Sequence, residues 1–152
     1  MINLSIIIPC YNESKSIPIL LKNFSKKLKR RDVELIIINN GSTDSTNSKL
    51  KIIKKKYDFL KIIYVKKNIG YGNGILQGLK KAKGKFISWT HADLQTDPYD
   101  TIMGFEKYKK KLSTNVYIKG KRYGRKIKDT FFTIGMSFFE SILLGKFLWD
   151  IN

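Results

Sequence analysis

Several polar residues follow short apolar runs in this chain, and their types suit the binding of a nucleotide. Tyr11 offers an aromatic ring that can stack on a base, and Glu13 can accept hydrogen bonds from a base or a ribose. Asn39 and Asn40 supply amide donors and acceptors for the same purpose. The glycines that begin at Gly70 allow the backbone to approach a ligand closely. Together these residues predict a nucleotide site.

His91 and Asp93 stand one residue apart, a spacing that can hold a divalent cation. In an extended backbone, side chains two positions apart lie on the same side. Imidazole nitrogen and carboxylate oxygen both bind divalent cations, and such a cation can bridge two phosphates. The pair therefore predicts a cation site. The alternative is a strand-end histidine whose hydrogen bonds are satisfied within the protein.

Alternating strand and helix patterns must position these residues. β-Branched and apolar runs predict strands at residues 4–8, 33–38, 60–65 and 86–89. Helical spacing of apolar residues predicts helices at residues 16–29, 42–56 and 74–82. Ser14 or Ser16 would cap the first helix, and Ser42 or Thr43 the second. This order predicts an open α/β fold with a mostly parallel sheet, in which ligands bind beyond the carboxyl ends of the strands.

The last third of the chain has a less regular pattern. It predicts a helix from Pro98 to Lys111, a short strand at 115–119, a basic loop at 121–128 and a helix at 131–149 with a wide apolar surface. Glu140 and Lys146 interrupt this last stretch, so it fails the test for a membrane span. The helix could lie on a membrane. Alternatively, it could pack against further sequence, because no signal for the end of a helix follows it, and we expect the C-terminal part to be incomplete.

The composition narrows the class of protein. The 152 residues include 30 Lys and Arg against 12 Asp and Glu, a formal charge of +18, which favours polyanionic partners such as phosphates or an anionic membrane. The alternative is that lysine is simply the default surface residue here. Zinc-finger ligands, an aromatic RNA-binding signature and a helix-turn-helix are lacking, so we expect no specific nucleic-acid partner. The single cysteine, Cys10, excludes an internal disulfide, is expected to be buried and inert, and favours a cytoplasmic setting.

Two nucleotide motifs are excluded by their spacing. The glycine run from Gly70 to Gly78 lacks the two-residue gap of the dinucleotide fingerprint and does not follow the first strand. The segment from Gly78 to Lys85 has five residues where a phosphate loop has four, and Phe86 stands where a magnesium-binding hydroxyl belongs.

Four segments in register resemble family 2 glycosyltransferases with the GT-A fold. They are residues 5–13, 40–44, 68–72 and 92–95. The resemblance is closest to the branch that transfers sugars to polyprenyl or dolichyl phosphates, because residues 120–125 precede Asp129 and a hydrophobic helix. It implies one GT-A-like domain over residues 1–152, with a nucleotide-sugar part at about 1–97 and an acceptor part at about 98–152.

The resemblance also implies residue roles. The donor nucleotide sugar would be held by Pro9, Tyr11, Glu13, Asn39, Asn40, Asn68, Gly70, Ala92 and Asp93. Asp93 would be the second acid of the family's Asp-x-Asp metal motif, with Gln95 facing the donor sugar. His91 replaces the first acid, and imidazole suits Mn²⁺ better than Mg²⁺. Arg122 and Arg125 offer bidentate forks for an acceptor phosphate, although both could be solvated loop charges.

The expected reaction is an inverting sugar transfer. A phosphate monoester is mostly dianionic at neutral pH, since its second pKa is about 6, and therefore needs no general base. A hydroxyl acceptor would need one, and the carboxylates to consider are Asp97, Asp129 and Asp150. We expect a cytoplasmic protein that can lie peripherally on the membrane. The alternative is a relative that binds nucleotide without transferring sugar.

Overall fold

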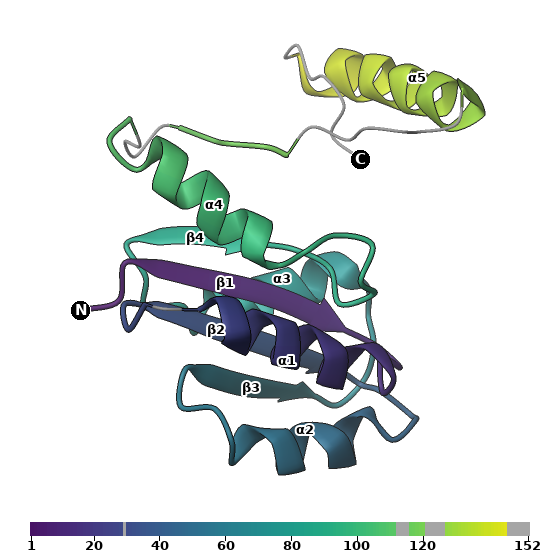
Figure 1. Cartoon of the computed structure of the whole chain (residues 1–152). Coiled ribbons are helices and arrows are strands. Elements are labelled where there is room, and N and C mark those ends of the chain that lie inside the picture. The colour runs from purple at the N-terminus through teal and green to yellow at the C-terminus, as the bar shows by residue number, and fades with distance from the viewer. Residues whose placement is uncertain (29, 112–115, 121–126, 146–152) are drawn as a thin grey trace. The chain divides into compact units, whose positions relative to one another are not determined.

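Four parallel strands form the sheet of this protein. The computed structural model describes residues 1–28, 30–111, 116–120 and 127–145. The strands are β1 (Leu4–Cys10), β2 (Val33–Asn40), β3 (Leu60–Val65) and β4 (Phe86–Trp89), in the spatial order β3-β2-β1-β4 (Figure 1). The predicted open parallel α/β sheet is therefore confirmed.

Helices cover both faces of the sheet. The helices α1 (Ser16–Lys27), α2 (Thr46–Lys54) and α4 (Tyr99–Tyr108) contribute buried residues to the larger apolar cluster on one face. The helix α3 (Tyr71–Leu79) lies against β1 and β2 on the opposite face, behind the sheet in the view of Figure 1. The unit formed by residues 1–116 thus has three layers, with the strands in the middle.

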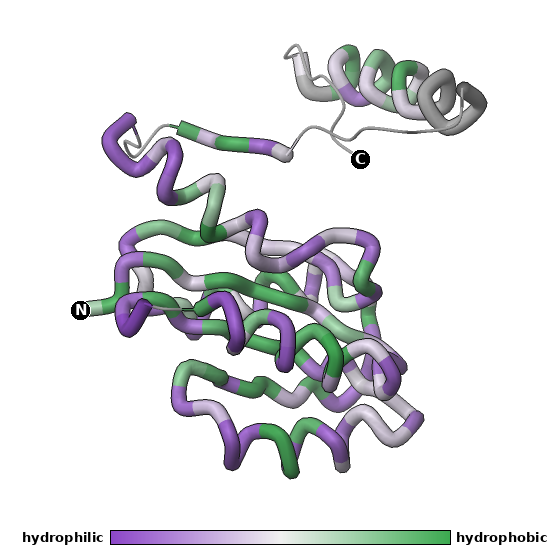
Figure 2. Tube along the Cα trace, viewed as in Figure 1, coloured by the Kyte–Doolittle hydropathy of each residue, from purple (hydrophilic) through white to green (hydrophobic). Residues whose placement is uncertain are grey.

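The core follows from the alternation of side chains along the strands. Ile6 and Ile8 of β1 pack with Leu20 and Phe24 of α1, whereas Ile7 faces the other way. All residues of β1 and β2 are buried, as expected for central strands covered on both faces. Figure 2 shows mainly hydrophobic colouring along the middle of these strands, while the helices alternate in hydropathy.

Two glycines let α3 approach the sheet closely. A Cβ atom on Gly74 would lie 2.9 Å from Cβ of Pro9, and one on Gly78 would lie 2.4 Å from Cγ2 of Ile7. Glycine at these two positions, one helical turn apart, therefore permits direct contact between α3 and β1. The glycine run that resembles a dinucleotide motif has a packing role.

The first two strands extend two residues beyond their predicted ends and include Pro9. Ile7 accepts a hydrogen bond from Thr90, just after β4, and β4 pairs with β1 only as far as Ile7. Alternate residues direct their backbone groups to the same side, so the Pro9 nitrogen points beyond the end of β4. A proline is tolerated there because no ladder bond is lost.

The predicted helix caps are wrong. Ser14 and Ser16 do not cap α1, whose N-cap is Lys15, because the Ser16 hydroxyl donates to the Glu13 carboxylate. Ser42 and Thr43 do not cap α2, which begins only at Thr46, where Asp44 Oδ1 accepts from the backbone N–H at 2.9 Å. Similarly, α3 begins at Tyr71, three residues earlier than predicted, after Gly70 with a φ of 108°.

Residues 117–152 form a second compact unit. Its helix α5 (Ile127–Leu144) begins and ends earlier than the predicted helix at 131–149. The predicted strand at 115–119 is wrong for residues 116–119, which have no regular structure, and residue 115 lies outside the described residues. No helix within the described ranges is both long and apolar enough to cross a membrane.

Candidate functional site

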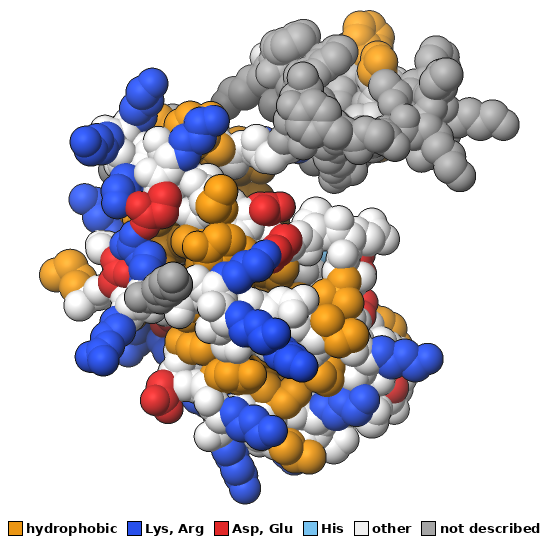
Figure 3. All heavy atoms as spheres, in the orientation of Figure 1, with side chains coloured by type: hydrophobic (Ala, Val, Ile, Leu, Met, Phe, Trp, Pro, Cys, Tyr) orange, Lys and Arg blue, Asp and Glu red, His pale blue; other side chains and the backbone are white. Residues whose placement is uncertain are grey.

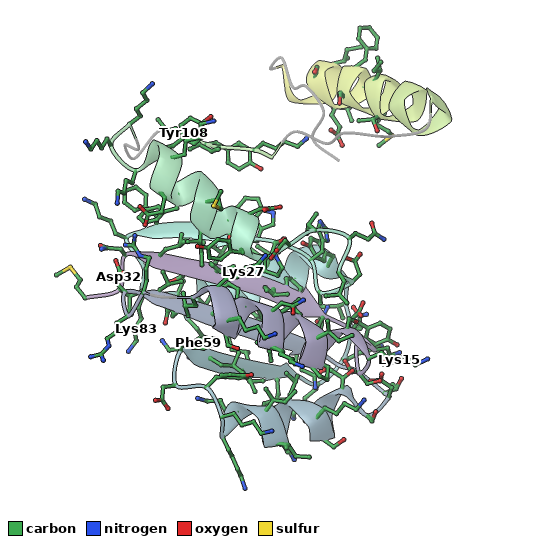
Figure 4. All side chains as sticks on the ribbon, in the orientation of Figure 1. Lys15, Lys27, Asp32, Phe59, Lys83 and Tyr108 are labelled. Atoms are coloured by element: carbon green, nitrogen blue, oxygen red, sulfur yellow. The ribbon has the colours of Figure 1, made fainter. Side chains whose placement is uncertain are left out.

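Four connecting segments gather at the carboxyl edge of the sheet. Lys15, after β1, lies at this end in Figure 4, whereas Asp32 and Lys83 lie at the opposite end. β2 and β3 lie on one side of β1, and β4 lies on the other. The strand order therefore reverses between β1 and β4, the position at which open α/β sheets bind ligands.

Asn12 joins the segment after β1 to the segment after β2. Its side-chain oxygen accepts from the backbone N–H of Thr43 at 2.8 Å and of Asp44 at 3.3 Å. Its own backbone N–H donates to the Ser42 hydroxyl at 3.0 Å. With a φ of 58°, Asn12 adopts a left-handed conformation that asparagine tolerates well. These bonds use the hydroxyl of Ser42 and the backbone of Thr43, the two residues predicted to cap α2.

Asp44 strengthens the same connection. Its Oδ2 accepts from the backbone N–H of Ser14 at 3.3 Å. Desolvation raises the pKa of Asp44, but hydrogen bonds from Thr46 and Ser14 outweigh it and lower the pKa to about 2. Asp44 is therefore ionised at neutral pH. Both of its carboxylate oxygens serve the loops rather than a ligand.

Asn40 joins the end of β2 to the segment before α3. Its Nδ2 donates to Asn68 Oδ1 and to the Gly70 carbonyl, each at 3.0 Å. Its Oδ1 is buried and receives no hydrogen bond from the described residues. A Cβ on Gly41 would lie 2.6 Å from the Asn68 nitrogen, so the two segments touch through their backbones. Asn39, alongside, accepts from the Ser42 N–H at 3.2 Å.

Tyr71 joins the start of α3 to the segment after β4. Its ring stacks on the His91 imidazole, with centroids 5.2 Å apart and planes inclined by 13°. Its hydroxyl donates to the Thr90 carbonyl at 3.4 Å. Desolvation, followed by the Asp93 carboxylate, raises the pKa of Tyr71 to about 12, so the phenol stays protonated.

The segment after β4 carries an unusual backbone conformation. Leu94, between Asp93 and Gln95, has a φ of 65°, which is uncommon for a residue without a special turn preference. The Gln95 N–H donates to Asp93 Oδ1 at 3.0 Å across this turn. His91, Asp93 and Gln95 are exposed, while Ala92 between them is buried. The turn therefore leaves three polar side chains exposed on one short segment.

His91 and Asp93 fit a divalent cation as a partial set of ligands. The described residues contain no group of three or more His, Cys, Asp or Glu side chains that could hold a metal ion. An imidazole with one carboxylate is a donor set that Mn²⁺ accepts, but it leaves most coordination positions to other oxygens. A diphosphate could supply such oxygens.

The structure brings together at this edge all of the residues predicted to bind the donor, together with His91 and Gln95. They are Pro9, Tyr11, Glu13, Asn39, Asn40, Asn68, Gly70, His91, Ala92, Asp93 and Gln95. Arg122, Arg125 and Asp150 lie outside the described residues, as does the side chain of Asp129. Asp97 forms an ion pair with Lys27 of α1, which argues against a role as a general base.

Sequence reasoning missed the roles of Asn12 and Tyr71. Asn12 and Tyr71 lie within the segments 5–13 and 68–72 that carry the family resemblance. Nothing in their sequence spacing indicates which residue each of them contacts. Asn12 is a common turn residue, and Tyr71 reads as a helix residue near glycines. Their partners, Thr43 and His91, become visible only when the sheet places the segments side by side.

A family model and curated relatives both match this chain as a glycosyltransferase. The model of glycosyl transferase family 2 matches residues 5–149. A poly-beta-1,6-N-acetyl-D-glucosamine synthase of Staphylococcus aureus is 36% identical over 106 residues, which are 68% of this chain and 25% of that protein. A putative glycosyltransferase of Bacillus subtilis, CsbB, is 32% identical over 109 residues, covering 68% and 33%. The chain thus spans about a quarter to a third of these curated relatives.

Solved structures share the fold. Staphylococcus aureus TarS in complex with UDP-GlcNAc matches with a TM-score of 0.66 and 26% identity, over 83% of this chain and 37% of that one. A mannosyltransferase from Pyrobaculum calidifontis, in complex with GDP-Man and Mn²⁺, matches with a TM-score of 0.56 and 26% identity, over 60% and 27%.

Proposed function

The chain belongs to glycosyl transferase family 2, and from this premise we propose that it binds a nucleotide sugar and transfers the sugar, with inversion, to an isoprenoid phosphate. The donor part of the proposal rests on one observation above all. The four segments beyond the strands are joined to one another by Asn12, Asn40 and Tyr71, and so form one continuous edge.

The chemistry of this edge supports a nucleotide sugar as the ligand. Tyr11 keeps 44% of its surface exposed and can stack on a base. The buried Oδ1 of Asn40 is an acceptor that a donor group of the nucleotide or a water molecule would satisfy. His91 and Asp93 would hold a divalent cation, which when bound neutralises charge on a diphosphate. The similar structures solved in complex with UDP-GlcNAc and with GDP-Man support the same donor class.

The proposed transfer is a single displacement. An oxygen of the acceptor phosphate forms a bond to the anomeric carbon on the face opposite the leaving group. The bond from that carbon to the nucleoside diphosphate breaks, and its electron pair leaves with the diphosphate. The acceptor is already a dianion at neutral pH, so no protein base is required. Arg122 and Arg125 are proposed to hold the acceptor phosphate.

Calorimetric titration of the full chain tests the donor proposal. UDP-GlcNAc, UDP-glucose and GDP-mannose would each be titrated with Mn²⁺, with Mg²⁺ and with EDTA. We expect one donor to bind, and Tyr11→Ala to weaken its binding roughly tenfold, as loss of a stacking platform does. Tyr108→Ala, at the far end of α4 (Figure 4), is the matched control and should bind as the wild type. No binding of any donor would overturn the proposal.

A peripheral membrane location is proposed together with the lipid acceptor. In α5 the polar residues Thr133 and Ser137 are buried, whereas Phe138 and Ile142 are 69% and 65% exposed. A helix that packs against its own unit normally buries its apolar residues and exposes its polar ones, and these four residues of α5 show the opposite pattern. Lys and Arg side chains are scattered over the surface in Figure 3, and the net charge of +18 complements anionic headgroups.

Sedimentation with phosphatidylglycerol vesicles tests this location. We expect binding at low salt that weakens at high salt and is lost in the double variant Phe138→Ser with Ile142→Ser. Ile52→Ser, which changes an exposed residue of α2 at 61% exposure, is the matched control. Equal binding by all three proteins, or none by the wild type, would count against a lipid surface for α5. Transfer of radiolabelled sugar to polyprenyl phosphate tests the acceptor directly.

A further inference from the structure

We propose that Tyr71 is a positioning residue that orients the His91 imidazole for the divalent cation. This inference rests on the proposed function and concerns the same site. Its basis is the stack between the two rings, whose centroids are 5.2 Å apart and whose planes are inclined by 13°. That separation lies within the range of offset-stacked aromatic pairs.

The need for such a residue follows from the ligand type. A carboxylate has two oxygens and several lone pairs, so it can reach a cation in many orientations. A neutral imidazole has a single lone pair in the plane of its ring, so the ring plane must be correct before it can bind. His91 is exposed, and a free rotation of its ring would cost affinity. Stacking on Tyr71 removes much of that freedom.

Tyr71 is itself held in place from two sides. Its hydroxyl donates to the carbonyl of Thr90, the residue before His91. Its backbone begins α3 directly after Gly70, whose carbonyl accepts from Asn40 Nδ2 at 3.0 Å. The ring is therefore anchored to β2 through Asn40 and to the end of β4 through Thr90. The His91 imidazole, which stacks on this ring, is therefore positioned relative to β2 and β4, the two strands on either side of β1.

The inference predicts an energetic coupling between residues 71 and 91. The quantity to measure is the cation enhancement, defined as the dissociation constant of UDP in EDTA divided by that in Mn²⁺. When His91 is present, we expect Tyr71→Ala to reduce this enhancement roughly tenfold. A loss of this size is typical when a residue that orients a metal ligand is removed. In a His91→Asp background, Tyr71→Ala should leave the enhancement unchanged, because a carboxylate does not need the ring.

Two further variants sharpen the test. Tyr71→Phe keeps the stacked ring and loses only the bond to Thr90, so it should retain most of the enhancement. Tyr108→Ala is the matched control for loss of a tyrosine outside the site. Circular dichroism of each variant reports whether α3 is still folded.

The outcomes separate this inference from the proposed function. Equal losses on Tyr71→Ala in both backgrounds would show a merely structural role and would overturn the inference. No cation enhancement in the wild type would also overturn it. Binding of UDP in EDTA tests the donor site independently, so a failure of the proposed function would appear there instead.

Discussion

The side-chain nitrogen of Asn40, at the end of β2, donates to the side-chain oxygen of Asn68 at 3.0 Å. The same nitrogen donates to the Gly70 carbonyl, so one buried amide sets the position of the segment that leads into α3. A carboxylate has no N–H to donate, so this connection depends on the amide.

Replacement of Asn40 by alanine should destabilise the protein. The variant removes the two hydrogen bonds that the buried Asn40 amide donates, to Asn68 and to Gly70, and each such bond contributes about 0.5–1.5 kcal/mol to the unfolding free energy. Urea denaturation measures the change. Asn47→Ala, an exposed site on α2, is the control and should change little. Equal stability of the two variants would show that the Asn40 bonds do not support the fold.

Two glycines of α3 should respond to alanine with opposite signs. Gly78→Ala places a Cβ 2.4 Å from Cγ2 of Ile7 and 3.0 Å from Cδ1 of Ile38, and overpacking of this kind costs about 1–3 kcal/mol. Gly72→Ala meets no atom within 4 Å, and alanine favours a helix over glycine by up to about 1 kcal/mol. Thermal unfolding of both variants checks the prediction, and a stabilised Gly78→Ala would contradict the close packing of α3.

A buried carboxylate should make stability depend on acid. Glu34 on β2 is 3% exposed and accepts at 2.6 Å from both the Ser5 hydroxyl and the Lys83 N–H. Burial raises the pKa of Glu34, but the ion pair with Lys61 and these hydrogen bonds outweigh it, so the pKa lies below its ordinary value of 4.5. This contribution is present above pH 4.5 and is lost as the pH falls through the lower pKa of the folded state.

The variant Glu34→Gln isolates that contribution. Near neutral pH it should lose about 1–3 kcal/mol of stability, because a glutamine amide replaces a charged acceptor. Its unfolding free energy should also fall less steeply than the wild type below pH 4.5. Asp58→Asn, at an exposed position, should retain the wild-type pH dependence. Denaturation over a pH series compares the three slopes, and identical slopes would rule out Glu34 as a source.

Cys10 should be unreactive in the folded protein. Its thiol is buried, and desolvation, followed by Glu13 and Asp44, raises its pKa to about 12. Almost no thiolate then forms at about pH 8, where an ordinary cysteine reacts readily. A thiol reagent should label the chain only after denaturation. Rapid labelling of the native protein would show that Cys10 is accessible.

Asp93→Ala should weaken the cation dependence of donor binding. If His91 and Asp93 hold the cation, the variant loses one of its two protein ligands and should show roughly a tenfold smaller cation enhancement of UDP binding. Asp93 Oδ1 accepts from the Gln95 N–H, so Asp93→Asn keeps that turn and serves as the matched control for local folding. Full cation dependence in Asp93→Ala would remove Asp93 from the metal assignment.

The strands of the sheet were predictable because each is marked by its own apolar run, whereas the strand predicted at 115–119 does not form at residues 116–119. The apolar runs of β1 and β2 mark central strands whatever surrounds them, and β3 and β4 were predicted with their observed bounds. Helix starts were less predictable. A serine at a helix start can cap it or bond elsewhere, and Ser42 bonds to Asn12, a residue of another segment.

Local patterns in the amino-acid sequence were enough to predict the order of strands and helices up to residue 108, the family, and the four polar segments that follow the strands. These depend on the residues within each segment. The stack of Tyr71 on His91 and the hydrogen bond from Asn40 to Asn68 could not be predicted in this way, because they form only when parallel strand pairing brings together segments that are distant in the chain. A close contact between distant segments leaves no periodic mark in either one, since its energy is gained only when the sheet has formed.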